Sequence, residues 1–208
     1  MINIFLNNVK NKFFSKIKNK NILFNIYNKN YTNNVLVSYI VEPFINGVNY
    51  THTNYQECML ICKVFDELNY NVDLIDYNNE TTKVNYQKYE IIFGFGHSLE
   101  ESFKFNELFK SIKIYYGTGN HLYYINTRSI QRIDEKYKET GKILLTSARY
   151  FEKAYSLQNI LSDAMILLGN NLTKKTFELT FKKNIYTLDA TFYKTIFSLN
   201  DKNITTVK

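Results

Sequence analysis

Short apolar runs, each closed by a turn and followed by helical spacing, recur along this chain and limit its fold more than any other feature. Each run is rich in β-branched and aromatic residues and is short enough for a buried strand. The runs occupy residues 34–41, 71–77, 89–93, 112–116 and 163–168, with 184–188 as a further edge strand. Alternation of such strands with helices predicts an α/β fold: a Rossmann-like, doubly wound, mostly parallel sheet with helices on both faces.

Helical spacing is clearest between the first two runs. Cys58, Cys62 and Phe65 recur on one side of a helix, which follows a capping box formed by Thr53 and Gln56. The two cysteines have no further Cys or His partners at ligand spacing, so we interpret them as core thiols and expect no metal site.

Other helices are predicted further along the chain. A second capping box, Ser98 with Glu101, indicates a helix after the third run. A helix over residues 121–137 is expected to end near Gly141, which is a suitable C-terminal cap. Residues 150–161 also have helical character.

The net charge of +7 is concentrated at the N-terminus. Residues 1–41 hold six lysines and no acid, which leaves only +1 for the rest of the 208-residue chain. The body therefore lacks the basic, arginine-bearing face that nucleic-acid binding favours, and we expect no nucleic-acid partner. Residues 1–24 combine lysines with an apolar stripe. This pattern is typical of a helix on an anionic membrane surface, or of an extension that is disordered or packs on the core, and both interpretations are open.

These observations divide the chain into three parts. We expect a basic N-terminal extension (1–33), one Rossmann-like domain (34–193) and a polar tail (194–208). The chain has no cysteine framework, no cleavable signal and no apolar run near the ~20 residues that span a bilayer. We therefore expect a cytoplasmic location, with peripheral attachment to the inner face of the membrane if residues 1–24 bind lipid.

Glycines and histidines gather directly after the predicted strands. In a doubly wound fold, the loops after the strands border a ligand crevice beyond the carboxyl ends of the sheet. A glycine there either lets a ligand approach the backbone or simply permits a tight turn, and both explanations are open. The candidate substrate-binding residues are Asn46, Gly47, Gly94, Gly96, Gly117, Thr118, Gly119, Asn170 and Thr173, and the candidate catalytic residues are His97 and His121.

No complete catalytic set accompanies these residues. A histidine at a crevice mouth can donate to a hydroxyl or phosphate, or act as a base, although for any single histidine a structural hydrogen bond is the commoner role. The chain has no GxGxxG after the first strand, no Walker loop and no GxSxG, and nothing implies a cofactor. A pair of acids could be drawn from Glu42, Glu57, Glu100 and Glu101, the last of which has the capping role given above.

Four segments carry a resemblance to a known family. They are VLVSYIVEPF, YEIIFGFG, YYGTGNH with the following YINTRSIQR, and DAMILLGNNLTKKT. Together they resemble the N-terminal domain of a bacterial GT-B glycosyltransferase of the family 4 or group 1 kind, and the resemblance covers about residues 34–193.

That resemblance implies the acceptor-side half of an enzyme that transfers a sugar from a nucleotide-sugar to a saccharide or lipid-linked acceptor in cell-surface polysaccharide synthesis. Backbone amides near Gly47 and Gly117 would contact the leaving diphosphate, and His97 or His121 would contact the acceptor hydroxyl or transfer a proton. The family continues into a second domain that holds most of the donor, whereas this sequence stops at Lys208. We therefore expect a fragment, or a second domain supplied by a partner chain, and little activity from this chain alone.

Two other classes of function fit the same residues. A non-catalytic sugar- or nucleotide-binding module would use the crevice without a second domain. A membrane-associated assembly protein would use the basic N-terminus instead.

Overall fold

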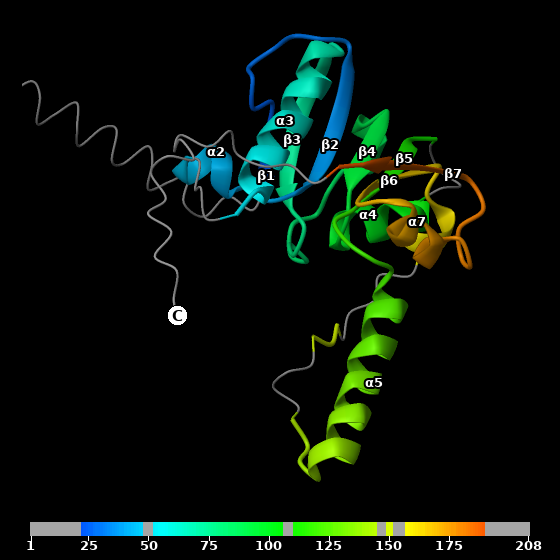
Figure 1. The fold of residues 1–208 in the computed structure, drawn as a ribbon. Helices are drawn as coiled ribbons and strands as arrows, with labels where there is room; N and C mark the ends of the chain where they lie inside the picture. The colour runs from blue at the N-terminus through cyan, green and yellow to red at the C-terminus, as the bar shows by residue number, and fades with distance from the viewer. Residues whose placement is uncertain (1–21, 48–51, 106–109, 145–148, 152–156, 190–208) are drawn as a thin grey trace, which may run out of the picture.

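The computed structural model describes residues 22–47, 52–105, 110–144, 149–151 and 157–189. It contains one seven-stranded sheet with the order β1-β3-β2-β4-β5-β6-β7 (Figure 1). The strands are β1 (Ile22–Leu23), β2 (Asn33–Tyr39), β3 (Tyr70–Asp76), β4 (Ile91–Gly94), β5 (Ile112–Gly117), β6 (Ala164–Leu168) and β7 (Asn184–Leu188). The helices are α2 (Glu42–Asn46), α3 (Asn54–Glu67), α4 (His97–Ser102), α5 (Leu122–Thr140), α6 (Gln158–Leu161) and α7 (Asn171–Phe177), with 3₁₀ turns η1 (Tyr86–Lys88) and η2 (Phe103–Phe105).

The sheet is mostly parallel, as the alternating pattern predicts. The short β1 pairs antiparallel with β3, and the pairings among β2 to β7 are all parallel. From β2 the chain goes first to β3 on one side and then crosses to β4 on the other. The switch point therefore lies between β2 and β4, where doubly wound folds bind their ligands.

Two cores lie on opposite faces of the sheet, because side chains alternate along each strand. Val35 and Val37 of β2 belong to one core, against Cys58, Cys62 and other residues of α3. Leu36 belongs to the other core, with residues of α4 and α7. Helices thus cover both faces, and the α/β fold expected from the sequence is confirmed. Both cysteines are fully buried, and the Cys58 thiol donates to the carbonyl of Ile40 at 3.1 Å.

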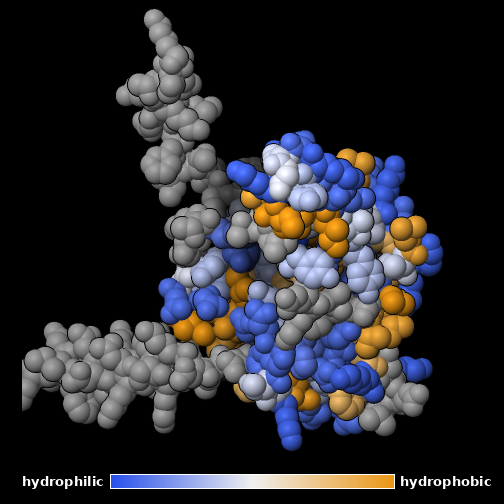
Figure 2. Space-filling model, turned by 90° about the horizontal axis from the view of Figure 1, so that it is seen from below, coloured by the Kyte–Doolittle hydropathy of each residue, from blue (hydrophilic) through white to orange (hydrophobic). Residues whose placement is uncertain are grey.

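The long helix α5 differs from the others because it projects away from the sheet (Figure 1). Ser129 is its one buried residue. The returning chain contacts α5 at two side chains. Ser129 Oγ donates to the carbonyl of Arg149 at 2.8 Å. The Asn126 side-chain amide donates to the Phe151 carbonyl and accepts from the Phe151 N–H, both at 2.9 Å. Viewed from the side toward which α5 projects, the surface is mainly hydrophilic, with hydrophobic groups in separate patches (Figure 2).

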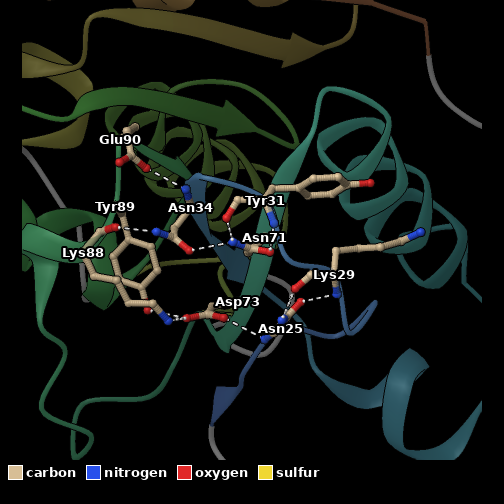
Figure 3. A network of polar contacts seen from close by, with 9 residues as sticks. All are labelled: Asn25, Lys29, Tyr31, Asn34, Asn71, Asp73, Lys88, Tyr89 and Glu90. Atoms are coloured by element: carbon tan, nitrogen blue, oxygen red, sulfur yellow. Dashed lines mark hydrogen bonds and ion pairs between the residues drawn. The ribbon is translucent and has the colours of Figure 1, made fainter.

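A polar network ties the first strands together (Figure 3). Its centre is the buried carboxylate of Asp73 on β3. This carboxylate accepts hydrogen bonds from Lys88 Nζ at 2.6 Å, from Tyr89 Oη at 2.8 Å and from the backbone N–H of Asn25 at 2.7 Å. The chain before β2 is therefore anchored to β3 by a charged acceptor that is hydrogen-bonded on both oxygens.

Several local predictions are wrong. Thr53 has helical backbone angles and makes no capping bond through its side chain, so the first capping box is absent. Ser98 lies inside α4, whose N-cap is Gly96, so the second is absent too. Within the segment predicted as a helix over 150–161, residues 158–161 form α6, residues 150–151 are not helical, and 152–156 lie outside the described residues.

The terminal segments also lie outside the described residues. This applies to most of the basic extension, residues 1–21, and to the polar tail. In the part of the chain that the structure describes, no helix is both long and apolar enough to cross a bilayer.

Candidate functional site

The predicted site residues all lie at one edge of the sheet. Strands β2, β4, β5 and β6 are mutually parallel, so the loops and first helical turns that follow them share the carboxyl edge. Asn46 and Gly47 end the helix that follows β2, while the remaining candidates follow β4, β5 or β6.

The glycines at this edge fall into two classes. A Cβ at Gly94 or Gly96 would collide with the backbone of Ser38 or Tyr77, and one at Gly117 would lie 3.2 Å from the Tyr115 ring and still closer to Leu167. Gly94 and Gly96 are therefore required by the protein's own packing, whereas a side chain at Gly117 would require the Leu167 side chain to move.

Gly119 and Gly47 behave differently. A Cβ at either position would meet no atom within 4 Å. Gly47 has a φ of +82°, a conformation that itself favours glycine, whereas Gly119 does not have a positive φ. Gly119 is thus the strand-end glycine for which neither packing nor conformation gives a reason among the described residues.

His121 is buried and its ring nitrogens are both engaged. Nδ1 accepts from the backbone N–H of Tyr123 at 3.2 Å, and Nε2 lies 3.4 Å from Thr180 Oγ1. This pattern suits the neutral ring with its proton on Nε2. Burial lowers the His121 pKa, which favours the same neutral form. In this arrangement His121 caps α5 and joins it to the chain after α7.

His97 is half-buried and begins α4. Its backbone N–H donates to the carbonyl of Tyr77 at 3.0 Å, and the preceding Gly96 N–H donates to Gln158 Oε1 at 3.1 Å. The carboxylate of Glu100 accepts the N–H groups of Leu157 and Gln158 at 2.9 and 3.0 Å. The backbone around His97 is therefore fixed, whereas its ring makes no hydrogen bond or ion pair with the described residues.

Of the remaining candidates, two have side chains engaged within the protein and two are exposed. Asn170 is the N-cap of α7, and its side-chain oxygen accepts from the N–H groups of Leu172 at 2.9 Å and Thr173 at 3.4 Å. The Thr173 side chain packs against Gly169. Asn46 and Thr118 are exposed, with no side-chain hydrogen bond to another described residue.

A buried acid near this edge has partners that the sequence does not reveal. Glu57, on α3, accepts from the hydroxyls of Tyr39 at 3.0 Å and Tyr116 at 3.4 Å. Tyr39 ends β2 and Tyr116 lies near the end of β5, so three separate elements meet at one carboxylate. Burial, and secondarily the charge of Glu57, raises the pKa of both tyrosines, so both hydroxyls stay protonated.

A second acid lies at the end of β3. Burial raises the pKa of Asp76, and the nearby charge of Glu42 adds to this effect, while hydrogen bonds from the backbone of Asn78 and Val41 oppose it. Glu42, one of the acids considered for a catalytic pair, thus has Asp76 as its acidic neighbour. Among the described residues, no group of three or more His, Cys, Asp or Glu side chains could hold a metal ion.

Comparison with known proteins adds no further constraint. The chain matches no protein-family model, no curated protein and no solved structure.

Proposed function

We propose that this chain is the acceptor-side half of a glycosyltransferase, which uses a nucleotide-sugar donor and a saccharide or lipid-linked acceptor. The sequence segments that resemble this family include the loops after β2, β4, β5 and β6. A doubly wound sheet with these loops at its carboxyl edge fits such a half.

The observation that carries the proposal is that the adjacent loops after β4 and β5 each contain two kinds of group. Most of their polar groups and glycines serve internal packing, whereas Gly119, the Thr118 side chain and the His97 ring are left for a ligand. Because neither packing nor conformation requires a glycine at 119, close approach of a bound molecule to the backbone is a direct explanation for it.

The roles of the two histidines follow from their surroundings. His121 is a positioning residue that holds the loop after β5. His97 is the residue that contacts an acceptor hydroxyl, and it can do so as hydrogen-bond donor or as base. Donor binding and exclusion of water from the reacting atoms are supplied by a second domain or partner chain, because one Rossmann-like half leaves its crevice open on one side.

The test is saccharide binding to the full chain, measured by calorimetry with a panel of oligosaccharides. We expect His97→Ala to weaken binding at least about fivefold, the loss of roughly one hydrogen bond. We expect a similar loss for Gly119→Ala, because its methyl group blocks the approach of the ligand to the backbone. The matched control is Gly141→Asn, which also adds a side chain in open space but lies at the far end of α5 and keeps a left-handed conformation that Asn tolerates. Equal binding by all variants, or no binding by the wild type, contradicts the proposal.

Turnover is measured separately, as release of nucleotide diphosphate from a panel of sugar donors. We expect none from the chain alone. Robust turnover would show that the site is complete without a second domain. Saccharide binding that never leads to turnover, even with candidate partner chains, would instead favour the non-catalytic binding module.

A further inference from the structure

A cavity of about 410 Å³ lies at the opposite, amino edge of the sheet. Its walls come from the start of η2, the start of β5 and the residues just before it, the end of α6, and the residue before β6. The residues that matter are Phe103, Lys110, Ser111, Lys113, Leu161 and Asp163. This volume lies within the range of small-molecule sites, which is about 300–1,000 Å³.

The feature that sets this cavity apart is a buried lysine in its wall. Lys113 is 3 % exposed. Its Nζ donates to Ser111 Oγ at 3.1 Å and lies 5.7 Å from the centre of the Phe103 ring. Burial lowers the pKa of Lys113, and the charge of Asp163 partly opposes this effect. A bound anion would favour the charged form of the lysine in the same way.

The acid in the wall, Asp163, acts on the Lys113 charge and also has other partners. Asp163 Oδ2 accepts the backbone N–H of Lys113 at 2.9 Å, and Oδ1 lies 3.6 Å from Lys183 Nζ. Lys183 also donates to the carbonyl of Ser162 at 2.9 Å. Among the described residues of the lining, Lys110 and Lys113 outnumber the one acid, Asp163, so this part of the wall carries an excess of positive charge.

We propose that this cavity binds a small organic anion. The anionic head, a carboxylate or a phosphate monoester, contacts Lys113 Nζ and Ser111 Oγ, and the apolar body packs on Phe103 and Leu161. Charge-assisted hydrogen bonds of this kind are about twice as strong as neutral ones. The anionic head group should therefore decide which small molecules the cavity binds. The site is separate from the carboxyl edge and does not depend on the proposed sugar transfer.

The probes are phenyl phosphate and benzoate, with benzyl alcohol as the neutral analogue and inorganic phosphate as the head alone. Binding to the full chain is followed by the backbone amide NMR signals of Ser111 and Lys113. We expect the better of the two anions to shift these signals and to bind at least about tenfold more tightly than benzyl alcohol and inorganic phosphate. The tighter of the two anions identifies the head group.

Two variants test the contacts. Lys113→Met keeps the apolar stem and removes the charge, and we expect binding of the better probe to weaken at least about tenfold. Lys136→Met, an exposed lysine on α5, is the matched control and should bind as the wild type does. Ser111→Ala leaves the lysine in place and should weaken binding about threefold, which keeps the contact testable if Lys113→Met does not fold. Absence of shifts at Ser111 and Lys113 with every probe, or unchanged binding in a folded Lys113→Met or Ser111→Ala protein, overturns the proposal.

Discussion

Gly94 lies so close to the backbone of Ser38 that a side chain at position 94 would collide with the Ser38 carbonyl group. The next residue reinforces this contact: the Phe95 N–H donates to the Ser38 carbonyl at 3.1 Å, and Ser38 Oγ donates to the Phe95 carbonyl at 2.7 Å. The ends of β2 and β4 are therefore held together by direct backbone contact.

This contact predicts a large effect of Gly94→Ala. The added methyl group meets backbone atoms that cannot rotate away, and φ at this residue is +125°. We expect the free energy of unfolding to fall by about 3 kcal/mol or more, measured by urea denaturation. Gly119→Ala adds the same group in open space and should change stability by less than about 0.5 kcal/mol. Similar losses in the two variants would contradict the division of the glycines.

The Asp73 network predicts a second stability effect. Asp73→Asn removes the charge that accepts from Lys88 and Tyr89, and we expect a loss of about 1.5–3 kcal/mol in unfolding free energy. The control is Asp134→Asn, which breaks an exposed ion pair with Lys138 on α5 and should leave stability close to that of the wild type. A small effect at Asp73 would mean that water can replace its hydrogen bonds without loss of unfolding free energy.

The protonation state of His121 predicts a pH dependence. Burial lowers its folded-state pKa below the unfolded value of about 6.5, so the unfolded chain binds more protons in the window below that value. Stability from this group is fully present above about pH 6.5 and is lost as the pH falls below it. His121→Gln should be less stable at pH 7.5 and should lose less further stability on acidification to about pH 5.5. Urea denaturation at both pH values measures this. If the unfolding free energy of His121→Gln falls as much between the two pH values as that of the wild type, the pH dependence belongs to other groups.

The Tyr39 and Glu57 pair predicts an interaction energy. Tyr39→Phe removes one donor from a buried carboxylate, which should lower the unfolding free energy by about 1–3 kcal/mol. A double-mutant cycle with Glu57→Met, which removes the acceptor and keeps the length of the side chain, separates this bond from general packing, and we expect a coupling of at least about 0.5 kcal/mol. Additive effects would show that the hydroxyl and the carboxylate do not stabilise each other.

Most of the sheet could be predicted because its strands carry their signal locally. The run 34–41 covers all of β2 except its first residue, and the run 112–116 lies within β5. The two-residue β1 was not predicted, because it depends on pairing with Ile75 and Leu74 of β3 and has almost no local pattern. Capping boxes are local patterns too, yet Thr53 adopts helical angles and makes no cap, so tertiary context prevailed over the motif.

The candidate site was predictable as a location and much less so as a set of contacts. Strand ends share an edge in any parallel sheet, so loop positions alone placed His97 and His121 there. The engagement of His121 by Thr180, 59 residues away in sequence, could not be foreseen. The partners of Glu57, 18 and 59 residues away, are equally remote, and local spacing carries no information about them.

The projection of α5 implies that the chain does not unfold as a single unit. A helix with one buried residue is held by few tertiary contacts with the described residues, and most of the stability of helices in proteins comes from such packing. Its far half, residues 130–140, should therefore open and close many times during the lifetime of the folded sheet, so that amide hydrogen exchange there reports a local equilibrium while β2 and β4 report the global one. A proteinase that attacks transiently open backbone would accordingly cut first in this helix, well before the sheet unfolds.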